Sequence, residues 1–220
     1  NYLPLFNGAT SANLSQFEKY LENFKTNNKN NTLGGLFKIK HKNHFVLVDV
    51  DSPPQRKFSK SYQSGPLSFE YFLDGEKIIT NSGFGIHISK KAELLSRLSA
   101  CQSTLTINET SITKFEKNEM INRVFGNSIQ NSFKSSGVAP KNEDDCIGCS
   151  ASNDGYEKKF GCTHKREIYV DKKNNFLKGR DQIFKAKDGY PIRYAFRFHI
   201  NPKLSVIKTM SGNSALIQIS

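Results

Sequence analysis

The stretch Leu67-Ser68-Phe69-Glu70-Tyr71-Phe72-Leu73-Asp74-Gly75-Glu76-Lys77-Ile78-Ile79-Thr80 decides the class of fold. Two apolar runs flank an Asp-Gly pair, which is typical of a tight hairpin turn because both of its residues tolerate positive φ. This stretch therefore predicts two antiparallel strands, one over 67–73 and one over 77–80.

The same period of two continues on both sides of this hairpin. Upstream, alternating apolar residues predict strands over 36–39 and 45–50, and Pro53-Pro54 ends the second of them. Downstream, strands are predicted over 103–107, 146–152, 165–170, 176–184, 193–200 and 204–209, with a last strand beginning at Ser214. Many short strands separated by turn signals predict an all-β, antiparallel β-sandwich.

Three segments depart from this pattern. Apolar residues at helical spacing predict short helices over Ser15–Lys25 and over 89–100. The segment from Glu116 to Asp145 is polar and irregular, which predicts a long surface loop with one or two short strands.

Charge narrows the class of partner. The chain has 32 Lys and Arg against 20 Asp and Glu, a formal net charge of +12. Such a surplus attracts polyanions, namely nucleic acid, anionic lipid or acidic polysaccharide, although a general bias towards lysine gives the same total. The sequence lacks a glycine-aromatic RNP motif, a zinc-finger spacing and a basic helix, so nucleic-acid binding rests on charge alone. It also lacks the run of 18 apolar residues expected of a transmembrane helix.

The cysteines allow two interpretations. Cys146-x-x-Cys149 followed by Cys162-x-His164 contains the residue types of a zinc site, although Cys-x-His is a tight pair for structural zinc. The alternative, which we favour, is that these are ordinary cysteines on neighbouring strands.

Several stretches, in this order, resemble the C-terminal β-sandwich domain of the heparinase II/III family of bacterial polysaccharide lyases. They are Leu3-Pro4-Leu5-Phe6-Asn7-Gly8, Ser61-Tyr62-Gln63-Ser64-Gly65-Pro66-Leu67-Ser68-Phe69-Glu70, Ile78-Ile79-Thr80-Asn81-Ser82-Gly83, Cys101-Gln102-Ser103-Thr104-Leu105, Asn153-Asp154-Gly155-Tyr156, His164-Lys165-Arg166-Glu167-Ile168-Tyr169 and Arg197-Phe198-His199-Ile200-Asn201-Pro202.

The resemblance implies a longer protein and a reaction. Family members join a helical toroid to this β domain and cleave acidic polysaccharide by β-elimination in the cleft between the two parts. We therefore expect residues 1–33 to be a linker with a short helix that follows such a toroid. Residues 34–220 are expected to be the β-sandwich, continuing beyond Ser220. The resemblance also implies the periplasm or cell envelope as location.

The resemblance further implies where a metal is held in related proteins. Metal-bearing members use two His and one Asp, and these positions correspond to Gln63, Asn81 and Gln102 here. Zinc prefers imidazole, thiolate or carboxylate ligands, so three neutral amides predict a hydrogen-bonded cluster without a metal. We list these three residues, with Lys165 and Arg166, as candidate substrate-binding residues. Ser61 stands near the position of a family histidine that shapes the active site.

The remaining candidates for catalysis are His164, Arg197, His199 and Tyr156. Removing the proton at C5 of a uronic acid requires a neutralised carboxylate, a base and an acid, and Tyr, His and Arg can fill these roles. Each candidate also has a structural interpretation: His164 caps a turn, Arg197 and His199 lie on a solvated strand face, and Tyr156 anchors a turn. Asp181 is predicted to be a turn or salt-bridge residue.

Three functions follow. The first is the β domain of a lyase acting on uronic-acid-containing polysaccharide. The alternatives are a non-catalytic carbohydrate-binding relic of the same fold and a basic nucleic-acid-binding protein. Because several catalytic groups of the family come from the helical toroid, we expect this chain alone to be inactive.

Overall fold

The computed structural model describes Phe6, residues 31–185 and residues 192–219. Its strands are β1 (Thr32–Leu33), β2 (Leu36–His41), β3 (His44–Asp49), β4 (Phe69–Leu73), β5 (Glu76–Thr80), β6 (Leu105–Ile107), β7 (Ser135–Asn142), β8 (Cys146–Tyr156), β9 (Cys162–Asp171), β10 (Phe176–Lys185), β11 (Tyr194–Phe196), β12 (His199–Ile200), β13 (Ser205–Lys208) and β14 (Ala215–Gln218). Its helices are short: α2 (Lys90–Ser96), α3 (Glu119–Phe125), α4 (Glu157–Phe160) and the 3₁₀ turns η1 (Arg56–Phe58), η2 (Gly85–His87) and η3 (Ser99–Cys101).

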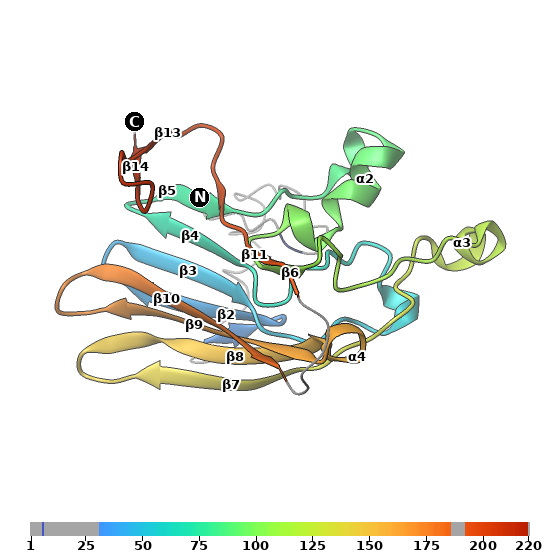
Figure 1. The fold of residues 1–220 in the computed structure, drawn as a ribbon, viewed down its shortest axis with the longest axis horizontal. Helices are drawn as coiled ribbons and strands as arrows, with labels where there is room; N and C mark the ends of the chain where they lie inside the picture. The colour runs from blue at the N-terminus through green and yellow to red at the C-terminus, as the bar shows by residue number, and fades with distance from the viewer. Residues whose placement is uncertain (1–5, 7–30, 186–191, 220) are drawn as a thin grey trace, which may run out of the picture.

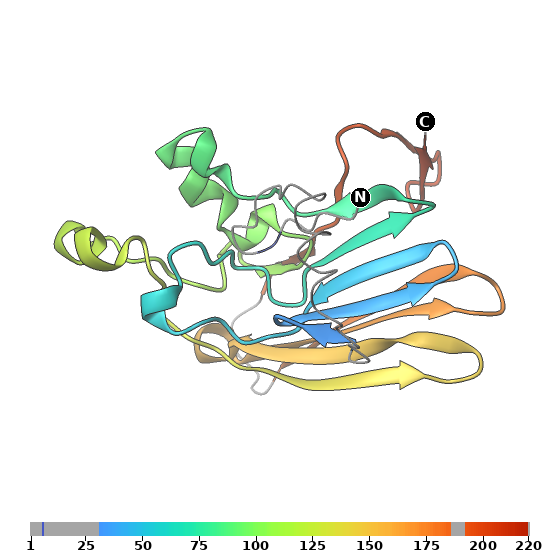
Figure 2. The same ribbon diagram turned by 180° about the vertical axis from the view of Figure 1, so that it is seen from behind.

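Two antiparallel sheets lie face to face. One has the strand order β1-β2-β3-β4-β5-β12 and the other β10-β9-β8-β7. Both views of the ribbon show the two layers, with the short helices gathered at one end (Figures 1 and 2). The antiparallel β-sandwich with a few short helices predicted from the sequence is confirmed.

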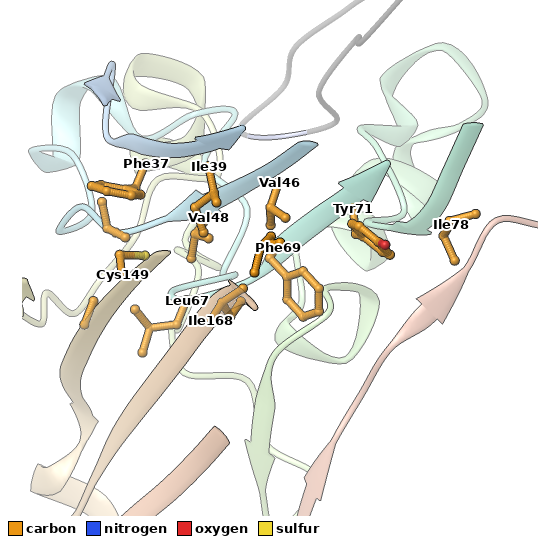
Figure 3. Close-up of a cluster of buried hydrophobic side chains, with 13 residues drawn as sticks. Phe37, Ile39, Val46, Val48, Leu67, Phe69, Tyr71, Ile78, Cys149 and Ile168 are labelled. Carbon is orange, nitrogen blue, oxygen red and sulfur yellow. The ribbon is translucent and has the colours of Figure 1, made fainter. Parts of the chain in front are cut away.

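The main core lies between the sheets, and the period of two in the sequence explains it. On β2, Phe37 and Ile39 are buried while Lys38 and Lys40 are exposed, because successive side chains of a strand point to opposite faces. Figure 3 shows side chains of the first sheet meeting Cys149 and Ile168 from the second. A second buried cluster, which includes Leu105, Ile107 and Ile112, lies outside this sandwich core.

The hairpin that decides the fold forms as predicted. β4 and β5 pair antiparallel, and the turn residues Asp74 and Gly75 have φ of 50° and 87°. These positive values explain why Asp and Gly stand at the turn.

The segment 116–145, predicted as a long surface loop with one or two short strands, contains a helix that the prediction missed and one strand that is longer than predicted. The first is α3, whose residues Met120, Val124 and Phe125 are exposed, so it has no buried stripe that would reveal a helix. The second is β7, an edge strand of eight residues that is exposed over seven of them and includes Gly137 and Pro140. An exposed edge strand carries no alternating apolar pattern.

Other boundaries also differ from the sequence-based prediction. The predicted strand over 193–200 is two short strands in different sheets: β11 pairs with β6, and β12 pairs with β5. The predicted helix over 89–100 is confirmed only as α2, where the Ser89 hydroxyl caps the helix by accepting from Ala92 N at 3.0 Å. The sheet already begins at β1, before the predicted boundary at residue 34. The predicted helix Ser15–Lys25 lies outside the described residues. No helix within the described ranges is long and apolar enough to cross a membrane.

Candidate functional site

The three amides at the family's metal positions come together at the end of the sandwich. Gln63, Asn81 and Gln102 are each at most 2% exposed. The Ser96 carbonyl accepts from Gln63 Nε2 at 3.1 Å and from Gln102 Nε2 at 2.8 Å. Asn81 Oδ1 accepts from the backbone N–H of Ser103, the residue after Gln102, at 2.8 Å. The three amides converge as predicted, but these bonds join them to backbone groups rather than to one another, and they come from connecting segments rather than from adjoining strands.

This amide cluster does not fit the metal that the family resemblance implies. The NH₂ groups of Gln63 and Gln102 donate to backbone carbonyls, and an amide that donates in this way presents no negative charge to a cation. Within the described residues, no group of three His, Cys, Asp or Glu is arranged to hold a metal ion. We therefore derive no chemistry from a metal at this position.

A buried ionic network lies on strands β9 and β10. Asp181 accepts from His164 Nε2 at 2.8 Å and from Arg166 through two bonds, Nε–Oδ1 at 2.7 Å and Nη2–Oδ2 at 3.0 Å. Arg166 Nη1 also donates to the carbonyls of Leu67 and Ser103, both at 2.7 Å. The network therefore ties the second sheet to the segment that carries the amide cluster.

Burial determines what these groups can do. Burial lowers the pKa of His164 and outweighs the hydrogen bond with Asp181, which raises it, while the charge of Arg166 lowers it further. Burial alone would raise the pKa of Asp181, but the hydrogen bonds from His164 and Arg166 outweigh it and lower that pKa. His164 and Arg166 are buried and their side chains already bond to protein groups, so a sugar binds neither without breaking the network. Asp181 acts as the predicted salt-bridge residue.

Tyr156 is buried and held by its hydroxyl. The hydroxyl donates to the Thr110 carbonyl at 2.8 Å and lies 3.4 Å from that of Leu105. Burial raises the pKa of Tyr156 to about 12. A general acid works best with a pKa near the operating pH, so this buried hydroxyl fits the turn anchor better than the general acid.

Arg197 and His199 retain partial contact with solvent. The Arg197 guanidinium donates to the Thr106 hydroxyl, and His199 Nε2 lies 3.0 Å from the Ala100 carbonyl. Between them, Phe198 is 49% exposed and packs edge-on against Phe69, with ring centroids 6.0 Å apart. Phe198 is therefore more exposed than the two polar residues beside it, and the strand is broken at this point.

Lys165 lies on the outer face of the second sheet. Its Nζ is 2.7 Å from Glu167 Oε1, and this hydrogen bond lowers the pKa of Glu167. Lys165 is the candidate substrate-binding residue of this strand that remains accessible, whereas Arg166 next to it points into the protein.

The cysteine arrangement excludes the zinc interpretation. Cys146 pairs across the sheet with Asp171, and Cys162 begins the same strand β9 nine residues earlier. At about 3.3 Å per residue, these cysteines lie roughly 30 Å apart. Cys149 packs into the sandwich core. All four cysteines are free, and the interpretation as ordinary cysteines on neighbouring strands is confirmed for Cys146, Cys149 and Cys162.

Arg97 was not identified from the sequence, yet it holds the segment that leads into Gln63 of the amide cluster. It is 0% exposed, and its guanidinium donates to the carbonyls of Tyr62 at 2.9 Å, Asn127 at 2.6 Å and Ser59 at 2.8 Å. Burial lowers its pKa to about 10, so it stays charged at neutral pH. A single Arg after a short helix gives no sequence signal for this role.

A cavity of about 560 Å³ lies beside the Asn153–Tyr156 motif, and we call it the lysine cavity. Its lining includes Lys114, Lys134, Lys158, Lys159, Phe133 and Tyr156, together with the carboxylates of Asp154 and Glu157. The glycine of the motif is required by a close approach: a Cβ on Gly155 would lie 2.2 Å from Ile112 Cδ1.

Known proteins resemble this chain in sequence and fold. FtsZ-localized protein C of Caulobacter vibrioides is 26% identical over 184 residues, which make up 79% of this chain and 31% of that protein. Heparan sulfate lyase HepC from Pedobacter heparinus matches with a TM-score of 0.68 and 14% identity, over 96% of this chain and 34% of the enzyme. A heparinase III gene product with methylated lysines matches with a TM-score of 0.70 and 15% identity, over 98% and 34%. At these identities the solved structures show the fold alone, and the chain spans about a third of each relative.

A family model settles the family. The model described as heparinase II/III-like, C-terminal, matches from residue 26 to residue 220, nearly the whole chain. The chain therefore belongs to the heparinase II/III-like family and corresponds to the C-terminal domain of its members.

Proposed function

We propose that this chain is the β domain of a polysaccharide lyase that cleaves an acidic, uronic-acid-containing polysaccharide by β-elimination. The observation that carries the proposal is the family match over residues 26–220. The fold it shares with HepC, whose name describes a heparan sulfate lyase, supports the reaction class. The resemblance to such enzymes also supports a place in the periplasm or cell envelope.

The residues of this domain fit a role in binding better than a role in proton transfer. Tyr156 and His164 are buried and engaged with protein partners. Arg197 and His199 keep solvent contact, and we assign Arg197 to the neutralisation of a substrate carboxylate, because guanidinium pairs well with carboxylate. In this proposal the base and the acid come from a helical toroid of the same protein.

The lysine cavity supports the proposal that the substrate is acidic. Four lysines face two carboxylates there, and the rings of Phe133 and Tyr156 provide apolar surface for the face of a sugar. Oligosaccharides of uronic acid combine both properties. Only the net positive charge favours nucleic acid as a partner, and nothing in the described residues adds to that support.

The test uses the full-length protein and follows the ultraviolet absorbance of the unsaturated product during incubation with heparan sulfate. We expect product from this acidic polymer and none from a neutral glucan. Arg197→Gln should lower kcat/KM by about 100-fold, the order of magnitude for losing one stabilising donor. The matched control is Arg193→Gln, because Arg193 is exposed and four residues away. Cleavage that Arg197→Gln leaves unchanged contradicts the assignment of Arg197.

A second candidate is a non-catalytic module that keeps carbohydrate binding. Two observations favour it: the metal positions hold Gln63, Asn81 and Gln102, and the sequence relative is named for its localisation with FtsZ rather than for an enzyme. Retention of the full-length protein on heparan sulfate in affinity electrophoresis, without any unsaturated product from several uronic-acid polymers, would select this candidate over the lyase.

A further inference from the structure

A second, smaller cavity of about 280 Å³ lies at the end of β3, and we call it the acidic cavity. Its lining includes Asp49, Asp51, Ser52, Phe58, Ser61 and Tyr62. No Lys, Arg or His lines it among the residues that the structure describes. In charge it is therefore the opposite of the lysine cavity.

Two polar groups of this cavity are buried without full partners. Asp49 is 4% exposed, forms no ion pair with another described residue, and accepts one long bond from Asp51 N at 3.4 Å. Tyr62 is also 4% exposed, and its hydroxyl has no hydrogen-bond partner among the described residues. Such groups are costly to bury, and native proteins usually satisfy them.

The two groups line the same cavity. Burial raises the pKa of Tyr62 well above its usual value, and the charges of Asp49 and Asp51 raise it further. Burial raises the pKa of Asp49 to about 8, so Asp49 is mostly protonated at pH 7 and can both donate and accept.

The surrounding backbone holds these groups in place. Ser135 Oγ donates to the Asp51 carbonyl at 2.8 Å, and Ser135 N donates to Ser52 Oγ at 3.0 Å. A Cβ on Gly35 would lie 2.7 Å from Asp51 Cβ, so a glycine is needed beside Asp51. Arg97 fixes the carbonyl of Tyr62. A site held this rigidly loses little entropy when a ligand binds.

The lining limits the class of ligand. A carboxylate ligand meets the charge of Asp51 and is repelled, and the described residues of the site offer only two carboxyl groups to a metal. A ring that carries several hydroxyls suits it, because hydroxyls donate to a carboxylate and accept from a protonated carboxyl or a tyrosine. Phe58, which is 68% exposed, offers a ring face at the rim.

We propose that the acidic cavity is a subsite for an uncharged sugar unit, whose hydroxyls bind Asp49, Asp51 and Tyr62. This inference rests on the proposed action on an acidic polysaccharide and extends it. One short segment links the two cavities: Lys134 lines the lysine cavity, and the next residue, Ser135, bonds to Asp51 and Ser52 of the acidic cavity. A polymer that alternates charged and uncharged units would therefore be bound in one register, with its uronate in the lysine cavity.

The test is a titration of the ¹⁵N-labelled chain with N-acetylglucosamine and, separately, with glucuronate, followed by amide chemical shifts. We expect N-acetylglucosamine to shift the amides of Gly35, Ser61 and Tyr62 at millimolar concentration. Glucuronate should bind there at least about tenfold more weakly, as a loss of about 1.4 kcal/mol would give.

Variants locate the binding. Tyr62→Phe removes a hydroxyl that has no protein partner, so it should leave the fold intact while weakening N-acetylglucosamine binding about three- to tenfold, the range for one neutral hydrogen bond. Asp51→Asn is the second variant and should weaken it about tenfold or more. Asp144→Asn, which changes an exposed carboxylate elsewhere, is the control with no expected effect.

The outcomes separate this inference from the proposed function. If the full-length protein cleaves heparan sulfate but N-acetylglucosamine leaves these amides unshifted, the subsite is refuted and the lyase stands. Glucuronate binding at these amides as tightly as N-acetylglucosamine also refutes the subsite. If the sugar binds as described and no acidic polymer is cleaved, the subsite stands and the lyase proposal fails.

Discussion

The two buried regions of this domain are held in different ways. The core between the sheets contains apolar side chains such as Phe37, Val46 and Ile168, whose burial depends on area and volume rather than on particular partners. The end of the sandwich instead buries charges and amides, including Arg97, Arg166 and Gln102, each of which bonds to specific groups. We therefore expect modest changes in the core to cost little stability, whereas removal of one partner at the polar end should cost much more.

The largest expected effect is at the buried ion pair. Asp181→Ala leaves Arg166 charged and buried without its carboxylate, which should lower the free energy of unfolding by about 3–5 kcal/mol. Urea unfolding followed by circular dichroism measures this change. Glu167→Ala, which breaks the exposed pair with Lys165 on the same strand, is the control and should cost less than about 1 kcal/mol. Equal costs for the two variants would remove the contrast between a buried and an exposed pair.

A pH series sharpens the comparison at Asp49. Because burial raises its pKa from 3.8 to about 8, the folded state holds a proton that the unfolded state releases between these values. Asp49 should therefore stabilise the fold fully below about pH 4. That contribution should fall as the pH rises from about 4 to about 8, and stay constant above it. The measurement is the difference in unfolding free energy between the wild type and Asp49→Asn across this range. A difference that does not change with pH would show that Asp49 is ionised in the folded protein.

Within the apolar core a smaller effect is expected. Ile39 is fully buried, and Ile39→Val removes one methyl group, which should cost about 0.5–1.5 kcal/mol. Thermal unfolding gives the value. A cost as large as that of Asp181→Ala would mean that the core is as intolerant as the polar end.

An effect of the same size is expected at Tyr156. Tyr156→Phe loses the bond to the Thr110 carbonyl and should cost about 0.5–1.5 kcal/mol, while polysaccharide cleavage by the full-length protein stays unchanged. Loss of kcat in a variant that unfolds at nearly the normal temperature would instead make Tyr156 catalytic.

The same contrast explains how much could be predicted from the sequence. Alternation in β2 to β5 and the Asp74-Gly75 turn predicted the sandwich, because apolar burial leaves a period in the chain. The convergence of Gln63, Asn81 and Gln102 came from the family resemblance rather than from any local pattern. Arg97, Asp49 and the burial of Arg166 could not be predicted, since a buried polar residue has the same letter as an exposed one. Its position depends on partners far away in the chain.

The most direct test of the central claim is where an acidic polysaccharide binds. The measurement is the Kd for heparan sulfate oligosaccharides at fixed salt, compared between two double variants of equal net charge. Lys134→Glu with Lys158→Glu alters the lysine cavity, whereas Lys38→Glu with Lys40→Glu alters the exposed face of β2. We predict that the first pair weakens binding by more than about tenfold and the second by less than about threefold. A lysine attracts the bound anion more strongly the closer it lies to it. Equal weakening by the two pairs would show that binding follows net charge alone, and it would contradict a carbohydrate site on this domain.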